Sequence, residues 1–196
     1  MNKLCLFLTA AVLSGSLRAQ LPVDRDPHHM VIQENPYYRL LEGKVPGGDT
    51  TPAHVHAANS VVIFLSHSTF GIRVIGDKPV ITTVNPGDLK YAAYGDKPVN
   101  HIVWNQSSNL FHFYVVELKK HTPTKDSCTV LSQPGIILQW QQPSVKAYVL
   151  NITDPLHLAP ASCARLVVSL TGGYHFYPPK TPIEVKGGRS ILLEIP

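Results

Sequence analysis

Residues 48–56 read Gly-Asp-Thr-Thr-Pro-Ala-His-Val-His and end in two histidines separated by one residue. Successive side chains of a strand point to opposite faces, so His54 and His56 would project to the same side. Inside a narrow β-barrel, two imidazoles would be costly to bury unless they were hydrogen-bonded or bound to a metal ion. From this stretch alone, a buried metal site and two surface histidines on an edge strand are equally open.

A second motif favours the metal site. Residues 85–88 read Asn-Pro-Gly-Asp, which is a strong turn signal, and residues 101–105 read His-Ile-Val-Trp-Asn. A third histidine, His101, therefore lies on a later β-prone run, and Asn105 follows it four residues further on.

The surrounding chain is β-rich throughout. Helical periodicity is nearly absent, and short β-prone runs recur between Gly, Pro, Asn and Asp, which is typical of an all-β sandwich or barrel. The first half predicts strands near Tyr38–Glu42, Thr51–His56, Val61–Leu65, Gly71–Ile75, Val80–Val84, Asp88–Tyr91, Val99–Trp104 and Phe111–Leu118. The second half predicts strands near Ile136–Trp140, Lys146–Asn151, Arg165–Leu170, Tyr174–Tyr177, Ile183–Val185 and Ser190–Ile195. The first series is long enough for a small jelly roll.

The two motifs together resemble those of the cupin superfamily over residues 37–118. They match its Gly, five residues, His-x-His pattern and its Pro-Gly turn followed by His-x-x-x-Asn. The resemblance implies a cupin jelly-roll barrel in which His54, His56 and His101 bind one divalent metal ion (Fe, Mn, Ni, Cu or Zn). By the same resemblance Asn105 would be structural.

One departure from the family pattern concerns the fourth ligand. Most metal-binding cupins carry a glutamate after a gap of three or four residues beyond His-x-His, where this sequence has Ser60 and Val61. Three neutral imidazoles would leave the ion its full charge and open positions for water or a chelating anionic substrate.

Three functions are compatible with such a site. The resemblance to three-histidine cupins implies a metal-dependent dioxygenase or oxidoreductase acting on a small chelating substrate. Loss of the glutamate is equally expected of a module that binds a small molecule or carbohydrate without turnover. Zinc hydrolysis is a third possibility, because three histidines and a water also form a zinc site. The sequence leaves open whether the protein is an enzyme.

Further residues are candidates to surround the metal site. They are Ser60, Tyr91, Trp104, His112 and Tyr114. The histidines outside the motifs are expected to be solvated or structural, and those at residues 28 and 29 to help dock the N-terminal arm.

The N-terminus has the pattern of a secretory signal peptide over residues 1–19: Lys3, an apolar run and the small residue Ala19 before the expected cleavage. The apolar run is shorter than the roughly 20 residues that span a bilayer, so we expect a secreted or periplasmic protein rather than a membrane-inserted one. Removing this segment takes Lys3 and Arg18 from 17 basic residues and leaves 13 acidic ones, which lowers the net charge from +4 to +2. So weak a charge does not predict a nucleic-acid partner.

The rest of the chain divides into an arm (residues 20–36), the barrel (37–118), a polar linker (119–135) and a second β segment (136–196). The second segment is interpreted as a truncated, degenerate cupin-like half that lacks the last two strands, although chance similarity is as good an explanation. Three alignments support a repeat: 148–150 with 38–40, 166–170 with 61–65, and 184–188 with 83–87. The second alignment places Ala159 and Ala161 opposite His54 and His56, so this half would have no metal site.

The two cysteines beyond the signal segment, Cys128 and Cys163, are predicted to form a disulfide, because an exported chain meets an oxidising compartment. Two free buried thiols are the alternative. Exposed strand edges in the second half could also support a homodimer.

Overall fold

A computed structural model of the chain describes residues 20–120 and 128–196. The expected signal peptide, residues 1–19, lies outside the described residues, as do residues 121–127 of the expected linker. Within the described ranges, no helix is long and apolar enough to cross a membrane.

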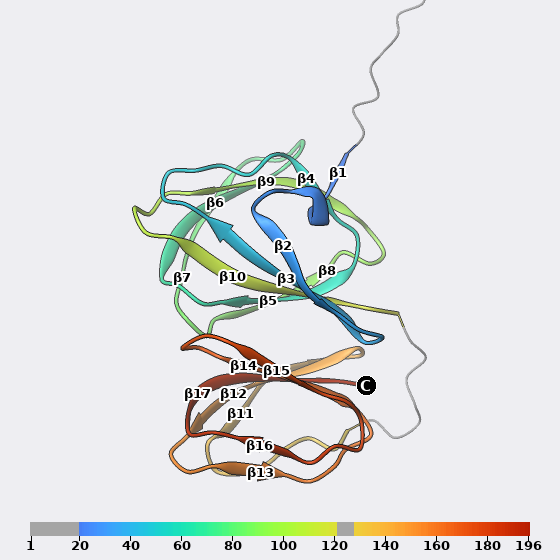
Figure 1. Cartoon of the computed structure of the whole chain (residues 1–196). Helices are drawn as coiled ribbons and strands as arrows, with labels where there is room; N and C mark the ends of the chain where they lie inside the picture. Colours follow the sequence, from blue (N-terminus) through green and yellow to red (C-terminus); the bar gives the residue numbers. More distant parts are fainter. Residues whose placement is uncertain (1–19, 121–127) are drawn as a thin grey trace, which may run out of the picture.

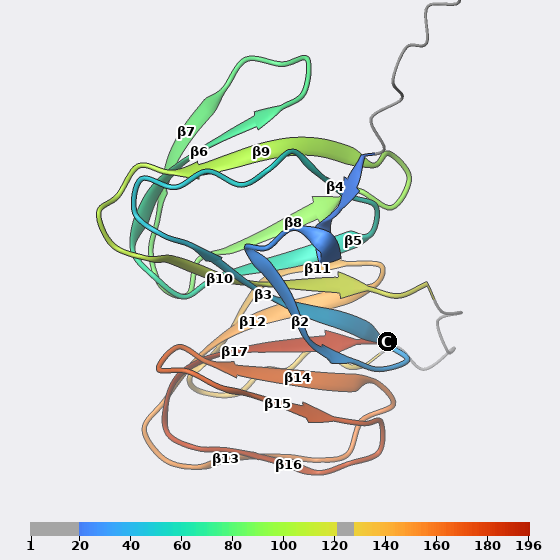
Figure 2. The same ribbon diagram turned by 45° about the horizontal axis from the view of Figure 1, so that its top comes forward.

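The first half of the chain forms two five-stranded sheets that enclose a barrel-like interior (Figure 1, Figure 2). One sheet has the order β1-β4-β9-β6-β7 and the other has the order β2-β3-β10-β5-β8. The strand bounds are Leu21–Pro22 (β1), His29–Glu34 (β2), Tyr38–Val45 (β3), His54–His56 (β4), Asn59–Phe64 (β5), Ser68–Val74 (β6), Val80–Val84 (β7), Leu89–Ala93 (β8), Val99–Asn105 (β9) and Phe111–Leu118 (β10). A short 3-10 helix, η1, covers Val23–Arg25. All eight predicted strands of this half are present.

The arm expected at residues 20–36 contributes β1, η1 and β2 to the barrel. β1 pairs in parallel with β4, and β2 pairs antiparallel with β3. The side chain of Val23 in η1 is 2% exposed and belongs to the barrel core. The sequence did not predict these strands because β1 is very short and β2 has a β-bulge between Val31 and Gln33 instead of a regular alternation.

The second half forms one five-stranded sheet, β11-β12-β17-β14-β15, and one two-stranded sheet, β13-β16. The bounds are Ile136–Gln142 (β11), Val145–Ile152 (β12), Leu156–Leu158 (β13), Ala164–Ser169 (β14), Tyr174–Tyr177 (β15), Ile183–Val185 (β16) and Gly188–Ile195 (β17). β13 was not predicted, since three residues are too few to show the two-residue alternation of a strand.

The strand order of the second half repeats that of the first. β11, β12, β17, β14 and β15 occupy the places of β2, β3, β10, β5 and β8, and the pair β13-β16 occupies the place of β4-β9. The second half is therefore a shortened cupin-like sandwich, as expected. The pair that it lacks is internal, the counterpart of β6 and β7, whereas the sequence alignment put the missing strands at the end.

Two of the three sequence alignments are corrected by this topology. Glu194 pairs with Lys146 and Arg165 just as Glu117 pairs with Arg39 and Ser60, which confirms the match of 166–170 with 61–65. The same register shifts the match of β12 with β3 by three residues.

The third alignment is wrong, because β16 takes the place of β9 and not that of β7. The counterpart of β4 is β13, so Ala159 and Ala161 lie beyond its end and are not opposite His54 and His56. Apolar residues of β13 and β16, among them Leu158, fill the corresponding interior instead.

The two halves pack sheet against sheet, which makes a stack of four layers (Figure 2). β10 and β17 lie in the middle of the two inner sheets and are buried along most of their lengths. Side chains of β3, β5 and β10 meet those of β12, β14 and β17 in one shared core. This double burial explains the continuous apolar runs of these strands.

The predicted cysteine pair is brought together in the second half. Cys128 and Cys163 lie at disulfide distance, with their Cα atoms 5.8 Å apart.

Candidate metal centre

The three predicted ligands converge inside the barrel. His54 and His56 lie on β4, and His101 lies on β9 directly opposite His54 in the antiparallel pair. Their exposures are 0%, 5% and 6%. The ring centroids are 4.7 Å apart for His54 and His101, 5.0 Å for His56 and His101, and 5.2 Å for His54 and His56. The strand alternation inferred from His-x-His therefore places the rings as expected.

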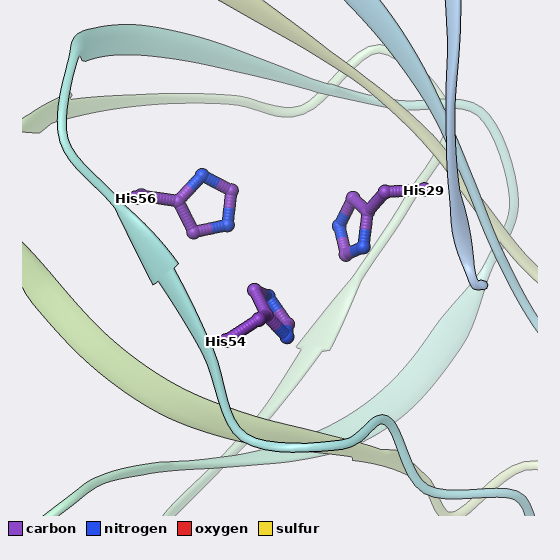
Figure 3. Close-up of side chains that lie close together, drawn as sticks. All are labelled: His29, His54 and His56. Atoms are coloured by element: carbon purple, nitrogen blue, oxygen red, sulfur yellow. The ribbon is translucent and has the colours of Figure 1, made fainter. Parts of the chain in front are cut away.

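A fourth histidine, His29, joins this cluster from the start of β2. Its ring centroid lies 4.8 Å from that of His54 and 5.8 Å from that of His56. Nitrogen atoms of His29, His54 and His56 lie within 4.8 Å of one another, so this group could hold a metal ion. Figure 3 shows the three rings turned toward a common centre.

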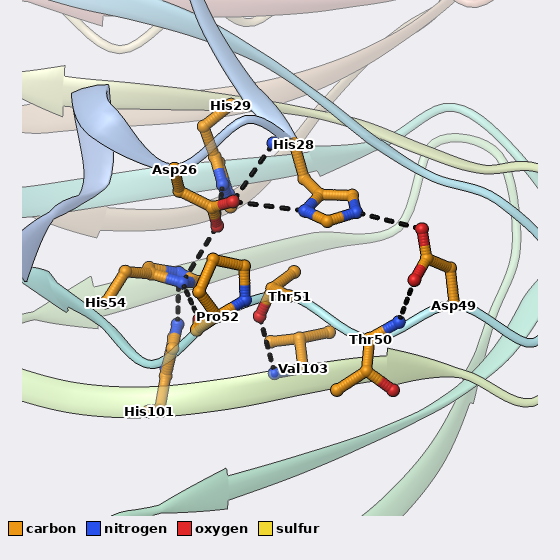
Figure 4. A network of polar contacts seen from close by, with 10 residues as sticks. All are labelled: Asp26, His28, His29, Asp49, Thr50, Thr51, Pro52, His54, His101 and Val103. Carbon is orange, nitrogen blue, oxygen red and sulfur yellow. Dashed lines mark hydrogen bonds and ion pairs between the residues drawn. The ribbon is translucent and has the colours of Figure 1, made fainter.

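A buried carboxylate, Asp26, connects two of these rings (Figure 4). Its Oδ2 atom is 2.9 Å from Nδ1 of His29 and 2.9 Å from Nδ1 of His54, and the residue is 1% exposed. Burial alone would raise its pKa, but the hydrogen bonds from His29 and His54 hold the pKa of Asp26 well below its usual range. Because a carboxylate only accepts hydrogen bonds, Nδ1 of both rings carries the proton.

The remaining ring nitrogens are available to a ligand. With Nδ1 protonated, Nε2 of His54 carries a lone pair and accepts a hydrogen bond of 3.0 Å from Nε2 of His101, which a shared metal ion would replace. Two nitrogens bound to one tetrahedral ion at roughly 2.0–2.1 Å would be about 3.3 Å apart, so this spacing suits a shared ion. Nδ1 of His56 and Nδ1 of His101 are buried and have no hydrogen-bond partner among the described residues.

Burial keeps these imidazoles in the form that binds metals. It lowers the pKa of His29 and His56, and it lowers the pKa of His101 to about 2. A neutral imidazole is the ligand form, because the lone pair must be free. The donor set therefore fits a divalent ion of the nitrogen-binding transition metals.

A second buried carboxylate, Glu117 on β10, lies behind His56. Its Oε1 atom is 3.8 Å from Nδ1 of His56, which is too long for a hydrogen bond. Arg39 holds the other oxygen, Oε2, at 2.7 Å through Nε and at 2.6 Å through a terminal nitrogen. Glu117 is paired with Ser60 across β10 and β5. A carboxylate therefore lies one strand away from the position where the family pattern has its glutamate.

Of the five further residues predicted to surround the metal site, only one lies next to the histidines. Ser60 lines the cavity next to the histidines, but its hydroxyl donates to the backbone oxygen of Ala58. Four candidates lie on outward faces of the barrel and do not reach the site: Tyr91 against Trp140, Trp104 over Gly71, His112 against Glu42, and Tyr114 in the core between the halves. They correct the prediction, since on β8, β9 and β10 the alternation turns them away from His101 and its neighbours. Asn105 holds the turn after β9 by donating to the backbone oxygens of Val45 and Asn109.

A small cavity of about 70 Å³ adjoins the histidines inside the barrel. Its walls are mainly apolar side chains from β5, β6, β9 and β10: Val62, Phe64, Phe70, Ile72, Val103, Phe111, Phe113 and Val115. Polar groups at its histidine end are Ser60, Lys90 and Tyr94. A larger groove of about 690 Å³ lies between the two halves, where Arg39 and Glu117 line it, but the histidines do not.

Sequence reasoning missed His29, Asp26 and Glu117. None of them belongs to a local motif, because their proximity to the site comes from pairing between strands distant in the chain. The one local signal was the arm's Asp-Pro-His-His at residues 26–29, which concentrates potential ligands in four residues.

No protein-family model matches the sequence, and no curated protein matches it. Solved structures do resemble it. AerE from Microcystis aeruginosa is 13% identical, with a TM-score of 0.55 over 87% of this chain and 98% of that one. YhhW from Escherichia coli is 12% identical, with a TM-score of 0.56 over 82% of each chain. A cupin domain from Bordetella pertussis Tohama I is 22% identical, with a TM-score of 0.44 over 52% of this chain and 99% of that one.

At these identities the likeness concerns the fold alone. The solved structures that the chain resembles include cupin domains, so its fold is similar to that of cupin proteins. The chain is an all-β protein that joins a jelly-roll barrel to a shortened sandwich of similar strand order, and among the described residues the histidine cluster lies in the barrel.

Proposed function

We propose that this protein is an exported metal-binding cupin that acts on a small chelating substrate at a divalent ion held by His54, His56 and His101. One observation carries the proposal: buried imidazoles from separate strands converge at the end of an internal cavity. Burying imidazoles is unfavourable unless their nitrogens are hydrogen-bonded or bound to a metal ion, and Nδ1 of His56 and Nδ1 of His101 have no hydrogen-bond partner among the described residues.

The cavity indicates what kind of ligand would fit. A space of about 70 Å³ with apolar walls suits a small molecule and leaves little room for a sugar ring with its many hydroxyl groups. Lys90 lines the same cavity and makes no ion pair among the described residues. A divalent ion with neutral ligands, next to a lysine, favours a small anionic compound over a neutral one. This observation argues against the carbohydrate-binding alternative.

Each group of the barrel would have a separate part in such chemistry. The apolar wall would exclude water, Asp26 would hold two imidazoles in their ligand form, and Lys90 would orient the anionic end of the substrate. A redox-active ion bound here would supply a common binding place for substrate and O2, and zinc would supply an activated water instead. Oxygen-dependent oxidation of a small chelating acid is the activity we propose, and binding without turnover is the alternative.

The residues before the barrel support export. Residues 1–19 have the composition of a signal peptide, and a cysteine pair at disulfide distance suits an oxidising compartment. Expression of the full chain in a secretion-competent host should yield protein shortened at Ala19. Recovery of the uncleaved chain from the reducing cytoplasm alone would contradict export.

The metal content of the full chain tests the site directly. Elemental analysis should find close to one transition-metal ion per chain in the wild type and almost none in a His54→Ala, His56→Ala double variant, since two of the ligands are gone. A His157→Ala, His175→Ala double variant, altered in the second half, is the matched control and should keep its metal. Equal metal content in the wild type and the barrel variant would rule out the proposed site.

The identity of the ion separates the activities. Iron, manganese, nickel or copper with O2 consumption in the presence of small keto or hydroxy acids would support oxidation. Zinc with no O2 consumption would instead favour hydrolysis or simple binding.

A further inference from the structure

The N-terminal arm, residues 20–36, lies directly against the strand that carries the motif histidines. Leu21 of β1 is the backbone neighbour of His54, and Pro22 is the neighbour of Val55. Val23 follows in η1 and is buried in the barrel core. The arm is therefore fixed on both sides of the turn that contains Asp26.

The turn between η1 and β2 places Asp26 between two rings of the cluster. One oxygen contacts Nδ1 of both His29 and His54 at 2.9 Å. The other oxygen accepts the backbone N–H of His28 at 3.0 Å and lies 3.1 Å from that residue's ring. So many partners hold the carboxylate in place, and it orients one ring of the arm and one ring of β4 together.

His29 presents its second nitrogen to the cluster. Its residue exposure is 5%, and its ring packs 5.6 Å from that of Phe113 at the barrel wall. Since Nδ1 donates to Asp26, Nε2 is the nitrogen that carries the lone pair. Figure 3 shows this ring facing those of His54 and His56.

Among the described residues, no carboxylate lines the cavity next to the histidines. Ser60, at the position of the family's glutamate, donates its hydroxyl to a backbone oxygen. The nearby carboxylate of Glu117 is held by Arg39 and lies on the Nδ1 side of His56.

We propose that His29 is the fourth metal ligand, in the place of the missing glutamate, and that Asp26 positions it. This inference rests on the proposed metal site and adds a consequence: binding of the ion and docking of the arm are coupled. The centre would then carry four neutral imidazoles, with its negative charge outside the ligand shell. A second tether supports the coupling, because Asp24 of η1 contacts Arg39 at 2.9 Å and Arg39 holds Glu117 behind His56.

The coupling is reciprocal by thermodynamic necessity. If the docked arm strengthens metal binding, then the bound metal must stabilise the docked arm by the same factor. The inference can therefore be tested both on the metal and on the arm.

The first experiment titrates demetallated full-length protein with Co²⁺ in the presence of a competing chelator. The His29→Gln variant should still bind one ion, but about 10- to 100-fold more weakly, the loss seen when a metal site is weakened by one supporting residue. The visible absorption of its cobalt complex should change, because an oxygen of water replaces a nitrogen. Asp26→Asn should weaken binding over the same range while keeping the wild-type cobalt spectrum, since all four rings remain.

The matched control is His112→Gln, a barrel histidine on an outward face that pairs with Glu42. It should bind Co²⁺ with the affinity and spectrum of the wild type. A His29→Gln variant that also matched the wild type in both respects would overturn the inference, while the three-histidine site would stand. Absence of stoichiometric binding by the wild type would instead defeat the proposed function.

The second experiment measures amide hydrogen exchange in residues 20–34 with and without Zn²⁺. Zn²⁺ should slow exchange in the arm of the wild type and of His112→Gln. In His29→Gln, a variant whose fold circular dichroism would verify, the same ion should leave the arm unchanged. Equal slowing in His29→Gln would contradict the coupling. If His29→Gln fails to fold, the wild-type protein alone tests the inference. Zn²⁺ must then slow amide exchange in its arm, and an unchanged exchange rate would overturn the inference.

Discussion

At the scale of single residues, two acidic groups lie close to the histidines and contact the ring nitrogens that face away from the centre of the cluster. Glu117 is 4% exposed and contacts Arg39, while Asp26 contacts His29 and His54. Burial would raise the pKa of Glu117, but its contacts with His56 and Arg39 lower that pKa below the usual value. Both carboxylates are therefore charged in the folded protein. Asp26 holds the rings of His29 and His54, and Glu117 lies next to the ring of His56.

Glu117→Gln removes the charge that Arg39 faces. We expect the free energy of unfolding to fall by about 2–3 kcal/mol, because charge-assisted hydrogen bonds in a buried position are lost. Urea denaturation measures the change. The control is Glu34→Gln, which breaks a solvent-exposed pair with Lys119 and should leave the stability nearly unchanged. Equal effects of the two substitutions would contradict the structural role assigned to Glu117.

Some residues of the candidate site could be predicted from the sequence and others could not. His54, His56 and His101 could be found because alternation along β4 and the antiparallel partner on β9 place them predictably. The position of His29 and Asp26 at the site could not be predicted, since no local sequence pattern indicates that β1 lies beside β4.

At the scale of elements, the fold depends on close approach between neighbouring strands. Gly71 of β6 is paired with Trp104 of β9, and the indole lies directly against the glycine. A Cβ atom at Gly71 would be 2.0 Å from the indole ring. This contact fixes the outward orientation of Trp104, and on β9 that orientation sends His101 inward.

Gly71→Ala should therefore destabilise the barrel. Moving the indole aside would cost about 1–3 kcal/mol, the usual effect of overpacking. Thermal unfolding followed by tryptophan fluorescence measures it, and Thr82→Ala on the exposed strand β7 is a control expected to change stability by about 0.5 kcal/mol or less. A Gly71→Ala protein as stable as this control would contradict the packing described for β6 and β9.

Element positions were the most predictable feature of the chain. Alternating or continuous β-prone runs between turn residues located every strand from β3 to β10. The exceptions are short strands and a bulged one, in which the two-residue period is interrupted or never established. Register between the halves could not be predicted, because strands buried on both faces look alike in sequence.

At the scale of the whole molecule, the second half gives the barrel a covered outer face. Sheet β2-β3-β10-β5-β8 buries one side against the histidine cluster and core of the barrel and the other side against the second half. In the second half, apolar residues replace the histidines, and Arg165 takes the place of Ser60 to pair with Glu194. Association of two copies was expected from the sequence and stays a prediction, which sedimentation velocity can check.

Global stability of the metal-free protein should depend on pH through the histidine cluster. Folding lowers the pKa of His29, His56 and His101, so below the unfolded value of 6.5 the unfolded chain binds protons that the folded one excludes. Stability should then fall as pH decreases from about 7.5 to 5.5, with a slope of about 1.4 kcal/mol per pH unit for each such proton. His28, whose pKa the contacts with Asp49 and Asp26 raise against the effect of burial, opposes part of this trend.

Urea denaturation at several pH values gives the slope. His101→Phe should reduce it, because one of the excluded protons is gone. A metal-free wild type that is equally stable at pH 7.5 and 5.5 would contradict the neutral, buried state of the cluster.

The most direct test of the metal centre is a crystal structure of the metal-loaded protein with anomalous scattering recorded at the absorption edge of the bound metal. We predict a single strong anomalous peak inside the barrel, bonded to His54, His56 and His101, with His29 as the fourth nitrogen neighbour. An ordered barrel without a peak among these histidines, or with the metal bound elsewhere, would contradict the account.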